Sequence, residues 1–157
     1  MKKIEVGSKI PEFTLHDQDG ITFSIKDYIG VKNLVIYFYP KDNTPGCTKE
    51  ACYFRDQYEE FSDNGAMIIG ISSQSSQSHN DFIEKHKLPF TLLSDRENIV
   101  HKMFGVNSNL FPGRVTFVVD KNGTIAYIFD SQINVTKHVD EALRIIKKLK
   151  APEIENV

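Results

Sequence analysis

The sequence predicts an α/β protein with a mixed β-sheet flanked by helices, on three observations. Two almost continuously apolar, β-prone runs, residues 33–39 and 66–72, are typical of strands covered on both faces. A stretch with helical spacing of apolar residues follows each run. Near the C-terminus, two β-prone segments flank an Asn-Gly turn, which indicates an antiparallel hairpin.

The segments on either side of the first buried run predict a hairpin and a helix. Residues 13–16 and 21–23 are β-prone, and Asp17-Gln18-Asp19-Gly20 forms a turn between them, which predicts an N-terminal β-hairpin. Residues 45–61 predict a helix, because Pro45 suits a first helical turn and aromatic residues then recur at helical spacing.

The second half of the chain continues the alternation of helices and strands. The serine-rich residues 72–78 predict a loop and a helix cap rather than a linker, because helical spacing continues through residues 80–86 and Pro89 closes that helix. The remaining elements expected are a strand over 90–93, a helix capped by Asp95 and reaching Phe104, a hairpin of 115–119 and 124–129, and an amphipathic helix over 136–149.

Length and composition predict one soluble globular domain over residues 1–157. A chain of this length buries a core without disulfide bonds, and 40% apolar and 25% charged residues are ordinary for a globular protein. A formal net charge of −2 argues against nucleic acid or an anionic membrane as a partner. The start of the chain has no apolar segment of a secretory signal, and no run approaches the ~20 apolar residues of a membrane span, so a reducing cytoplasm is expected.

Two cysteines, Cys47 and Cys52, are the only ones in the chain. The expected strand ends in a Pro/Asn/Gly loop that opens into the expected helix, which places Cys47 in the first helical turn. Free N–H groups and the helix dipole favour an anion there, and the thiolate is the reactive form of cysteine. By spacing alone, the pair could be redox-active, metal-binding or simply buried.

A metal site would need further thiolate or imidazole ligands. The histidines are scattered through separate elements with no ligand-like spacing, so we expect all of them to be structural or solvated, and we expect no metal and no cofactor. They are His16, His79, His86, His101 and His138.

The residues around Cys47 carry a longer motif. Pro40, Thr44 and Cys47 fit the pattern P-x-x-x-T-x-x-C, within the string Tyr39-Pro40-Lys41-Asp42-Asn43-Thr44-Pro45-Gly46-Cys47-Thr48-Lys49-Glu50-Ala51-Cys52. With the matches below, which span about residues 6–149, the chain closely resembles the peroxiredoxins, and among them the peroxiredoxin Q or bacterioferritin-comigratory-protein branch. The further matches are Ser78-His79, Leu88-Pro89-Phe90, Leu93-Ser94-Asp95, Phe104-Gly105-Val106 and Pro112-Gly113-Arg114-Val115-Thr116-Phe117.

The resemblance implies a thioredoxin-like fold and a thiol peroxidase that serves antioxidant defence. Cys47 would attack the O–O bond of hydrogen peroxide or an organic hydroperoxide and become a sulfenic acid. Cys52 would condense with that sulfenic acid to an intramolecular disulfide. The resemblance also implies thioredoxin or a similar dithiol as the reductant that reopens the disulfide.

Physical chemistry explains the other residues that the resemblance assigns to the site. A free thiol, with a pKa near ~8.5, is mostly protonated at neutrality, and a helix terminus contributes only ~0.3–2 kcal/mol, so a cation is needed. By resemblance the cation is Arg114, whose fork of donors can serve both the thiolate and a peroxide oxygen. Thr44 would hold the peroxide and also cap the helix, Pro40 would shield the thiolate from water, and Glu50 would orient the arginine.

Helix geometry adds a conformational requirement to the resolving step. Two residues five positions apart in an α-helix have Cα atoms roughly 8.5–9 Å apart, which exceeds the ~7 Å limit for a disulfide. The reduced protein should therefore have a helix across residues 47–52, and the oxidised protein should not.

The two cysteines also bear on two alternative functions and on the oligomeric state. A general thiol-disulfide oxidoreductase is disfavoured, because the chain has C-x₄-C and no C-x₂-C. A redox-sensing interaction protein has no second domain or charged partner surface to support it. Because the resolving cysteine lies in the same chain, a dimer is unnecessary for chemistry, and a monomer is expected.

Overall fold

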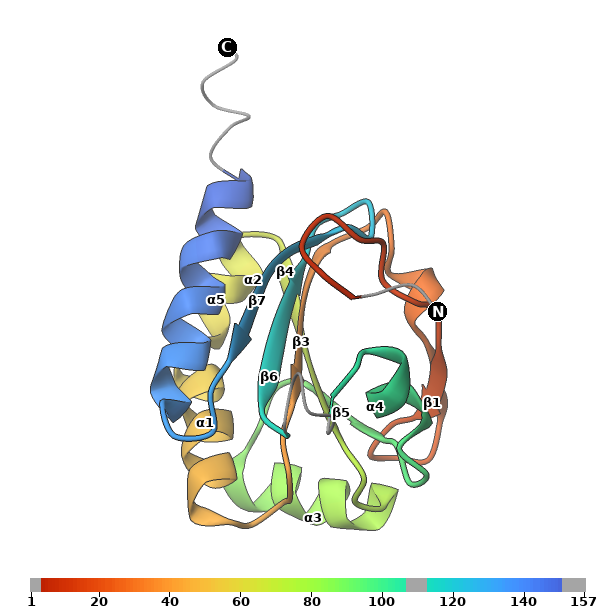
Figure 1. The fold of residues 1–157 in the computed structure, drawn as a ribbon. Helices are drawn as coiled ribbons and strands as arrows, with labels where there is room; N and C mark the ends of the chain where they lie inside the picture. The colour runs from red at the N-terminus through yellow and green to blue at the C-terminus, as the bar shows by residue number, and fades with distance from the viewer. Residues whose placement is uncertain (1–3, 107–112, 151–157) are drawn as a thin grey trace.

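A computed structural model describes residues 4–106 and 113–150 of the chain (Figure 1). These residues form a seven-stranded sheet in the order β2-β1-β5-β4-β3-β6-β7. The parallel strands β3, β4 and β5 lie between antiparallel neighbours on both sides, so the mixed sheet predicted from the sequence is confirmed. The strands are β1 Thr14–His16, β2 Thr22–Ser24, β3 Asn33–Phe38, β4 Ala66–Ser72, β5 Thr91–Ser94, β6 Val115–Val119 and β7 Ile125–Asp130.

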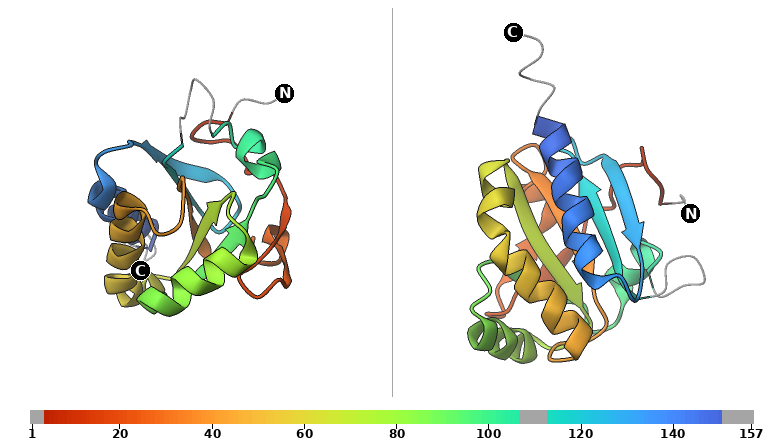
Figure 2. Two further views of the ribbon diagram at one scale, coloured as in Figure 1. Left: turned by 90° about the horizontal axis from the view of Figure 1, so that it is seen from below. Right: turned by 90° about the vertical axis from the view of Figure 1, so that its left-hand side faces the viewer.

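Helices cover both faces of this sheet. One face packs against α1, α2, α3 and α5, and the other packs against α4, η1 and the segment before β1. Figure 2 shows α1 and α5 side by side on the first face. The helices are η1 Ile25–Asp27, α1 Pro45–Asp56, α2 Tyr58–Asp63, α3 Ser76–His86, α4 Ile99–Met103 and α5 Val135–Lys150.

Strand β3 is central because both of its faces are apolar. Leu34, Ile36 and Phe38 belong to the core on the α4 side, whereas Val35 and Tyr37 belong to the core under α1 and α5. This is the period-two alternation of a strand, with both sides buried. The same pattern confirms the buried strand predicted over residues 66–72, which the structure assigns to β4 with the same limits.

The helix predicted over residues 45–61 is wrong as a single element. The helix ends at Asp56, Gln57 leaves the helical conformation (φ −100°, ψ 6°), and a second helix begins at Tyr58. Phe54 and Phe61 still lie in one core, with ring centroids 5.7 Å apart. The apolar spacing therefore continues across a break that it cannot reveal.

Two predicted helix starts also shift. Helix α3 begins at Ser76, because the hydroxyl of Ser75 caps it by accepting from the N–H of Ser78 at 3.1 Å. Helix α4 is shorter than predicted and begins only at Ile99. The N-cap residue is Asn98 and not Asp95 as predicted, but the Asp95 carboxylate still accepts from the N–H of His101 at 2.8 Å and of Val100 at 3.3 Å in the first turn.

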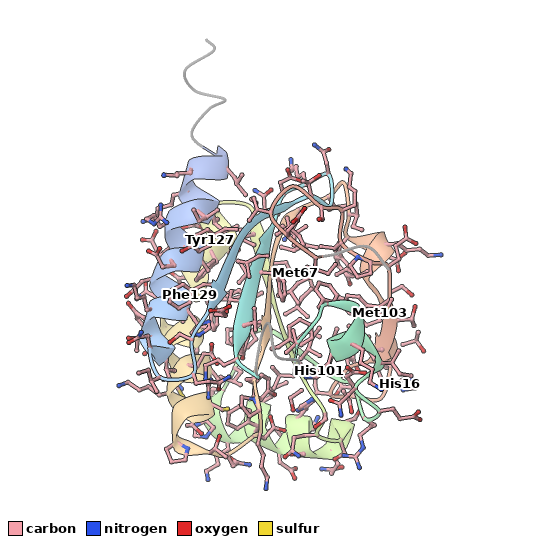
Figure 3. All side chains as sticks on the ribbon, viewed as in Figure 1. His16, Met67, His101, Met103, Tyr127 and Phe129 are labelled. Atoms are coloured by element: carbon pink, nitrogen blue, oxygen red, sulfur yellow. The ribbon has the colours of Figure 1, made fainter. Side chains whose placement is uncertain are left out.

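The last helix is fixed to the sheet through β7. Tyr127 and Phe129 project from β7 towards α5 (Figure 3). The hydroxyl of Tyr127 donates to Glu141 at 2.9 Å, and the ring of Phe129 lies edge-on to His138, with centroids 4.7 Å apart. In the parts of the chain described, no helix is long and apolar enough to cross a membrane. Pro112 and both ends of the predicted domain, 1–3 and 151–157, lie outside these residues.

Candidate active site

The end of β3 and the start of α1 together position Cys47. The loop after β3 turns through Asn43, which has a left-handed backbone (φ 62°), and α1 begins at Pro45. Cys47 is the third residue of α1 and precedes the first helical hydrogen bond, from the N–H of Thr48 to the carbonyl of Thr44 (2.9 Å). Its own N–H therefore has no acceptor within the helix, and the helix dipole favours an anion at its sulfur. The residue is only 1% exposed.

The pairing of β3 with β6 brings a cation to that sulfur. Phe38 pairs with Val115, so Arg114, which immediately precedes β6, lies beside the end of β3. Its Nη2 donates to the Sγ of Cys47 at 3.3 Å. Burial opposes its charge, but Glu50 and Cys47 raise the pKa of Arg114 above its usual value. The guanidinium is therefore a permanent positive charge at the sulfur.

Glu50 binds the other end of the same guanidinium, as the sequence predicted. Arg114 Nη1 donates to Glu50 Oε1 at 2.5 Å, and the glutamate side chain is completely buried. Burial raises the pKa of Glu50 to about 8, although Arg114 acts in the opposite direction. Near neutrality the carboxyl is therefore largely uncharged, which leaves the positive charge of Arg114 to face the sulfur.

His138 faces this pair from α5. Its Nε2 donates to the carbonyl of Ser131 at 2.7 Å, and its Nδ1 lies 2.8 Å from the Thr116 hydroxyl and 3.8 Å from Glu50 Oε2. Burial lowers the pKa of His138 to about 4, and the charge of Arg114 adds to that effect, against the Ser131 hydrogen bond. The ring is therefore neutral, and its Nδ1 accepts from Thr116. The position of His138 was not predictable from the sequence, because its partners come from β6 and the loop after β7.

Three buried polar atoms lack a hydrogen-bond partner in the described part of the chain: Tyr37 Oη, Glu50 Oε2 and Arg114 Nε. Such atoms are rare in native proteins. Two of them belong to the Glu50–Arg114 pair, so the site retains unused hydrogen-bonding capacity next to Cys47.

Thr44 and Pro40 lie in the loop before α1, and their roles toward a peroxide stay predictions. Thr44 is the N-cap residue, as the sequence predicted, but its hydroxyl donates to the carbonyl of Lys41 at 2.8 Å and makes no cap hydrogen bond to a helix N–H. Pro40 is exposed. The burial of Cys47 comes from the core under α1, where it packs with Tyr37, Tyr39 and Ala51 among others.

Cys52 lies further along α1 and is partly buried. Both cysteines are free thiols, and α1 runs without interruption across them. This is the helix expected for the reduced protein. The loss of that helix on oxidation stays a prediction.

Sequence reasoning missed a second buried group beside the site. Asp42, between Pro40 and Thr44, is only 4% exposed, and its carboxylate is paired with His79 of α3 at 2.7 Å. Both residues occur in the strings that carry the family resemblance, which was the only available signal. Histidines at unrelated positions give no ligand-like spacing, so the contact itself was not predictable.

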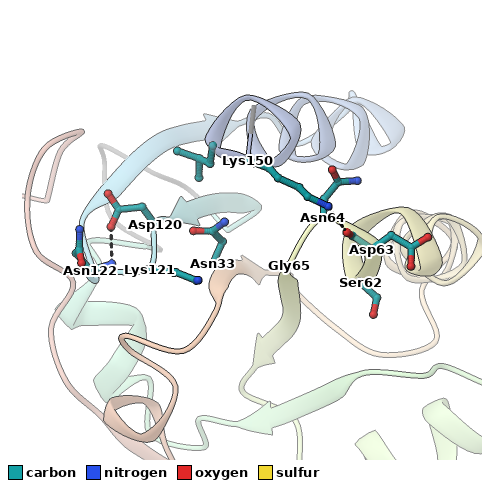
Figure 4. A pocket seen from close by; sticks show the side chains of 10 residues that line it. Asn33, Ser62, Asp63, Asn64, Gly65, Asp120, Lys121, Asn122 and Lys150 are labelled. Carbon is teal, nitrogen blue, oxygen red and sulfur yellow. Dashed lines mark hydrogen bonds between the residues drawn. The ribbon is translucent and has the colours of Figure 1, made fainter. Parts of the chain in front are cut away.

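In the part of the chain that the structure describes, no metal cluster accompanies this site, and a surface pocket lies at the other end of β3. Within residues 4–106 and 113–150, no group of three or more His, Cys, Asp or Glu side chains could hold a metal ion. A pocket of about 570 Å³ lies at the opposite edge of the sheet, where β3 begins at Asn33 (Figure 4). Its lining includes Asp63, Asp120 and Lys150, and Lys150 Nζ already donates to the carbonyl of Asp63 at 2.7 Å.

Comparison with known proteins adds an independent line of evidence. Residues 6–128 match the AhpC/TSA family. The chain is 52% identical over 151 residues to a chloroplastic peroxiredoxin Q of Sedum lineare, covering 94% of this chain and 81% of that protein. It is also 52% identical over 148 residues to the chloroplastic peroxiredoxin Q of Arabidopsis thaliana, covering 92% of this chain and 68% of that protein.

Solved structures agree with these relatives. The peroxidoxin BcpB of Mycobacterium tuberculosis superposes with a TM-score of 0.87 at 32% identity, covering 94% of this chain and 99% of that one. A peroxiredoxin Q of Xanthomonas campestris gives a TM-score of 0.78 at 33% identity, covering 87% and 90%. These matches confirm the thioredoxin-like fold that the sequence predicted.

Proposed function

This chain belongs to the AhpC/TSA family and is a thiol-dependent peroxidase of the peroxiredoxin Q type, and we propose that Cys47 is its peroxide-reducing thiol. The observation that carries this assignment is the hydrogen bond from Arg114 Nη2 to the buried Cys47 sulfur, at the N-terminus of α1. A helix terminus and a guanidinium both stabilise an anion, and here they converge on one sulfur atom.

In the first step, the Cys47 thiolate attacks the nearer oxygen of a hydroperoxide. The O–O bond breaks, the sulfur gains that oxygen as a sulfenic acid, and the departing oxygen takes a proton and leaves as water or an alcohol. Arg114 stabilises the charge that moves from sulfur to the departing oxygen. The Thr44 hydroxyl donates its hydrogen bond to the backbone carbonyl of Lys41, so its lone pairs remain free to accept from the peroxide O–H. Pro40 shields the reacting atoms from outside the core.

In the second step, Cys52 attacks the sulfenic sulfur. The S–O bond breaks, water leaves, and a disulfide forms within one chain. The first turns of α1 unwind for this, because a helix holds Cα atoms at this spacing roughly 8.5–9 Å apart. A dithiol of the thioredoxin type then exchanges with the disulfide and restores both thiols.

We also propose that the protein acts as a monomer in a reducing compartment. A monomer suffices, because peroxide-reducing and resolving thiols share one helix. A reducing compartment such as the cytoplasm suits a chain that carries its cysteines as free thiols.

Mass spectrometry after treatment with one equivalent of hydrogen peroxide tests this function. The wild-type chain should lose two hydrogens and yield a 47–52 crosslink within a single chain, and added dithiol should allow repeated turnover. Cys47→Ser should abolish peroxide consumption, whereas Cys52→Ser should still form the sulfenic acid. Unchanged peroxide consumption by Cys47→Ser would overturn the assignment. Single oxidation without turnover would instead favour a redox sensor.

A further inference from the structure

The loop that leads into α1 is tied to the rest of the fold through one carboxylate. Asp42 accepts from the hydroxyl of Tyr39 at 2.5 Å through Oδ1, and its Oδ2 accepts from the hydroxyl of Ser78 at 2.7 Å. The same Oδ2 lies 2.7 Å from Nδ1 of His79. Ser78 and His79 belong to α3, so the carboxylate connects the loop before Cys47 to a different helix.

The imidazole of His79 uses both of its nitrogens in this connection. Its Nε2 lies 3.0 Å from the carbonyl oxygen of Leu93 in β5, and the side chain is fully buried. A carbonyl oxygen only accepts, and so does an ionised carboxylate, so the ring satisfies both partners only by donating from both nitrogens. Burial opposes the charge on Asp42, but the hydrogen bonds and charge of His79, with Tyr39 and Ser78, lower the pKa of that carboxyl. The carboxylate of Asp42 and the imidazole of His79 thus form a buried, hydrogen-bonded pair that joins the loop to α3 and β5.

This pair bears on the active site through the position of Asp42 in the chain. Asp42 lies two residues after Pro40 and two before Thr44, and the N-cap Thr44 opens the helix that carries Cys47. Fixing Asp42 against α3 and β5 therefore fixes the start of α1. Removing one partner of a buried, hydrogen-bonded pair leaves the other unsatisfied, so this connection is strong in the reduced protein.

We propose that the Asp42–His79 pair is a latch that holds the loop before α1 in the peroxide-reducing conformation and restrains the unwinding that lets Cys47 reach Cys52. His79 is thereby a positioning residue, acting on the chemistry through Asp42 and the loop. The inference rests on the proposed function, because it assigns opposite effects to its two chemical steps. The first step needs Thr44 and Cys47 in place, and the second needs the start of α1 to leave its place.

The chain contains a matched control for this latch. His101 of α4 forms a second buried pair with Asp95, with Nδ1 2.6 Å from Oδ2. His101 stacks edge-on to Phe38, in the core on the α4 side of the sheet, whereas Cys47 lies in the core on the other side. Replacing either histidine breaks a buried Asp–His pair, but only one of the two pairs is attached to the loop before Cys47.

The experiment measures the two steps separately in full-length His79→Gln, Asp42→Asn and His101→Gln. Because the chain has no tryptophan to report the reaction, reduced protein is mixed with hydrogen peroxide, quenched with a thiol-blocking reagent and analysed by mass spectrometry. His79→Gln should slow sulfenic acid formation roughly tenfold to a hundredfold, the range expected when reacting groups are displaced, and should speed disulfide closure. Asp42→Asn should change both steps in the same directions and carries the test if His79→Gln does not fold. His101→Gln should leave both rates close to wild type.

Any other pattern overturns the latch. Rates in His79→Gln and Asp42→Asn that match those in His101→Gln would show that the pair is only structural, and so would a slowing of both steps together. Failure of the wild-type chain to form the 47–52 disulfide would instead overturn the proposed function itself, and the latch with it.

Discussion

The guanidinium of Arg114 lies 3.3 Å from the sulfur of Cys47, although 67 positions separate the two residues in the chain. Strand pairing explains the contact, because Arg114 precedes β6 and β6 runs antiparallel to β3, whose end leads to Cys47. The two terminal nitrogens of the guanidinium have different partners, the Cys47 sulfur and the Glu50 carboxyl. A single ammonium cannot reproduce this geometry.

Arg114→Lys should therefore slow the oxidation of Cys47 by peroxide despite keeping the charge. We expect a loss of about 10²–10³-fold, as for removal of one positioned donor to a developing charge, and a larger loss for Arg114→Gln. Rapid-quench mass spectrometry of the sulfenic acid measures the rate. The control is Arg144→Lys, at a surface pair with Glu141 (3.0 Å), which should react like wild type. An Arg114→Lys rate equal to wild type would remove the bidentate contact from the mechanism.

From the raised pKa of Glu50 we expect Cys47 to lose reactivity at alkaline pH. Its pKa of about 8 means that the carboxyl is mostly uncharged below that pH and ionised above it. Once ionised, it offsets the positive charge that Arg114 presents to the sulfur. The rate of Cys47 oxidation should therefore decline as the pH rises through about 8. Glu50→Gln stays neutral and should lack this decline, so identical alkaline limbs in the two pH–rate profiles would contradict the prediction.

A substitution at Gly46 should slow the reaction of Cys47 without destabilising the fold. A Cβ at this position would lie 3.2 Å from Arg114 Nη2, the nitrogen that donates to Cys47. Gly46 is the second residue of α1 and has no positive φ, so alanine meets no backbone strain there and reduces the entropy of the unfolded chain, which is worth roughly 0.4–1 kcal/mol. Gly46→Ala should thus keep or raise the melting temperature while slowing Cys47 oxidation. A variant that reacts at the wild-type rate would show that the guanidinium can shift without consequence.

From the lowered pKa of His138 we expect the folded protein to lose stability in mild acid. Its pKa in the folded protein, about 4, is below the ordinary 6.5, so the unfolded chain binds more protons between these values. The free energy of unfolding should fall as the pH drops from about 6.5 to about 4, by an amount of order 3 kcal/mol from this residue. Urea denaturation at several pH values should show a shallower dependence in His138→Gln across that window. Parallel curves for variant and wild type would refute the assignment.

A substitution at Gly70 should affect only the stability of the fold. It pairs with Tyr37 across β3 and β4, and a Cβ there would lie 2.6 Å from Leu92 Cδ2 and 2.9 Å from Tyr37 Cζ. Gly70→Ala should destabilise the fold by about 1–3 kcal/mol, the usual cost of overpacking. Thermal unfolding measures this, and an unchanged melting temperature would show that the aromatic ring moves aside freely.

The strands were predictable from the sequence because each carries its own signal. Residues 33–38 and 66–72 are apolar on both faces, and each hairpin has a polar turn between two β-prone segments. The residues at which helices begin and end were harder to predict from the sequence. The break at Gln57 involves no proline or glycine, and Phe54 and Phe61 remain in one core on either side of it.

Some residues of the active site were likewise predictable from the sequence, whereas others were not. Cys47 was predictable because strand, loop and helix are consecutive in the chain, so its place at a helix N-terminus follows from local order. Arg114 was reached only through family resemblance, since strand register decides what lies beside β3. The contacts of His79 and His138 depend on how α3 and α5 pack, and no spacing in the sequence encodes such packing.

Two hydrogen bonds beyond Cys52 should limit how much of the fold is disturbed by oxidation. Tyr53, the residue after Cys52, donates its hydroxyl to Asp140 of α5 at 2.5 Å, and Arg55 donates to the carbonyl of His86 at 2.7 Å. The remainder of α1 is thus anchored immediately beyond the second thiol. If α1 unwinds as proposed, we expect each catalytic cycle to melt and rebuild only about two helical turns, while the sheet beneath keeps its structure and guides the segment back to its reduced shape.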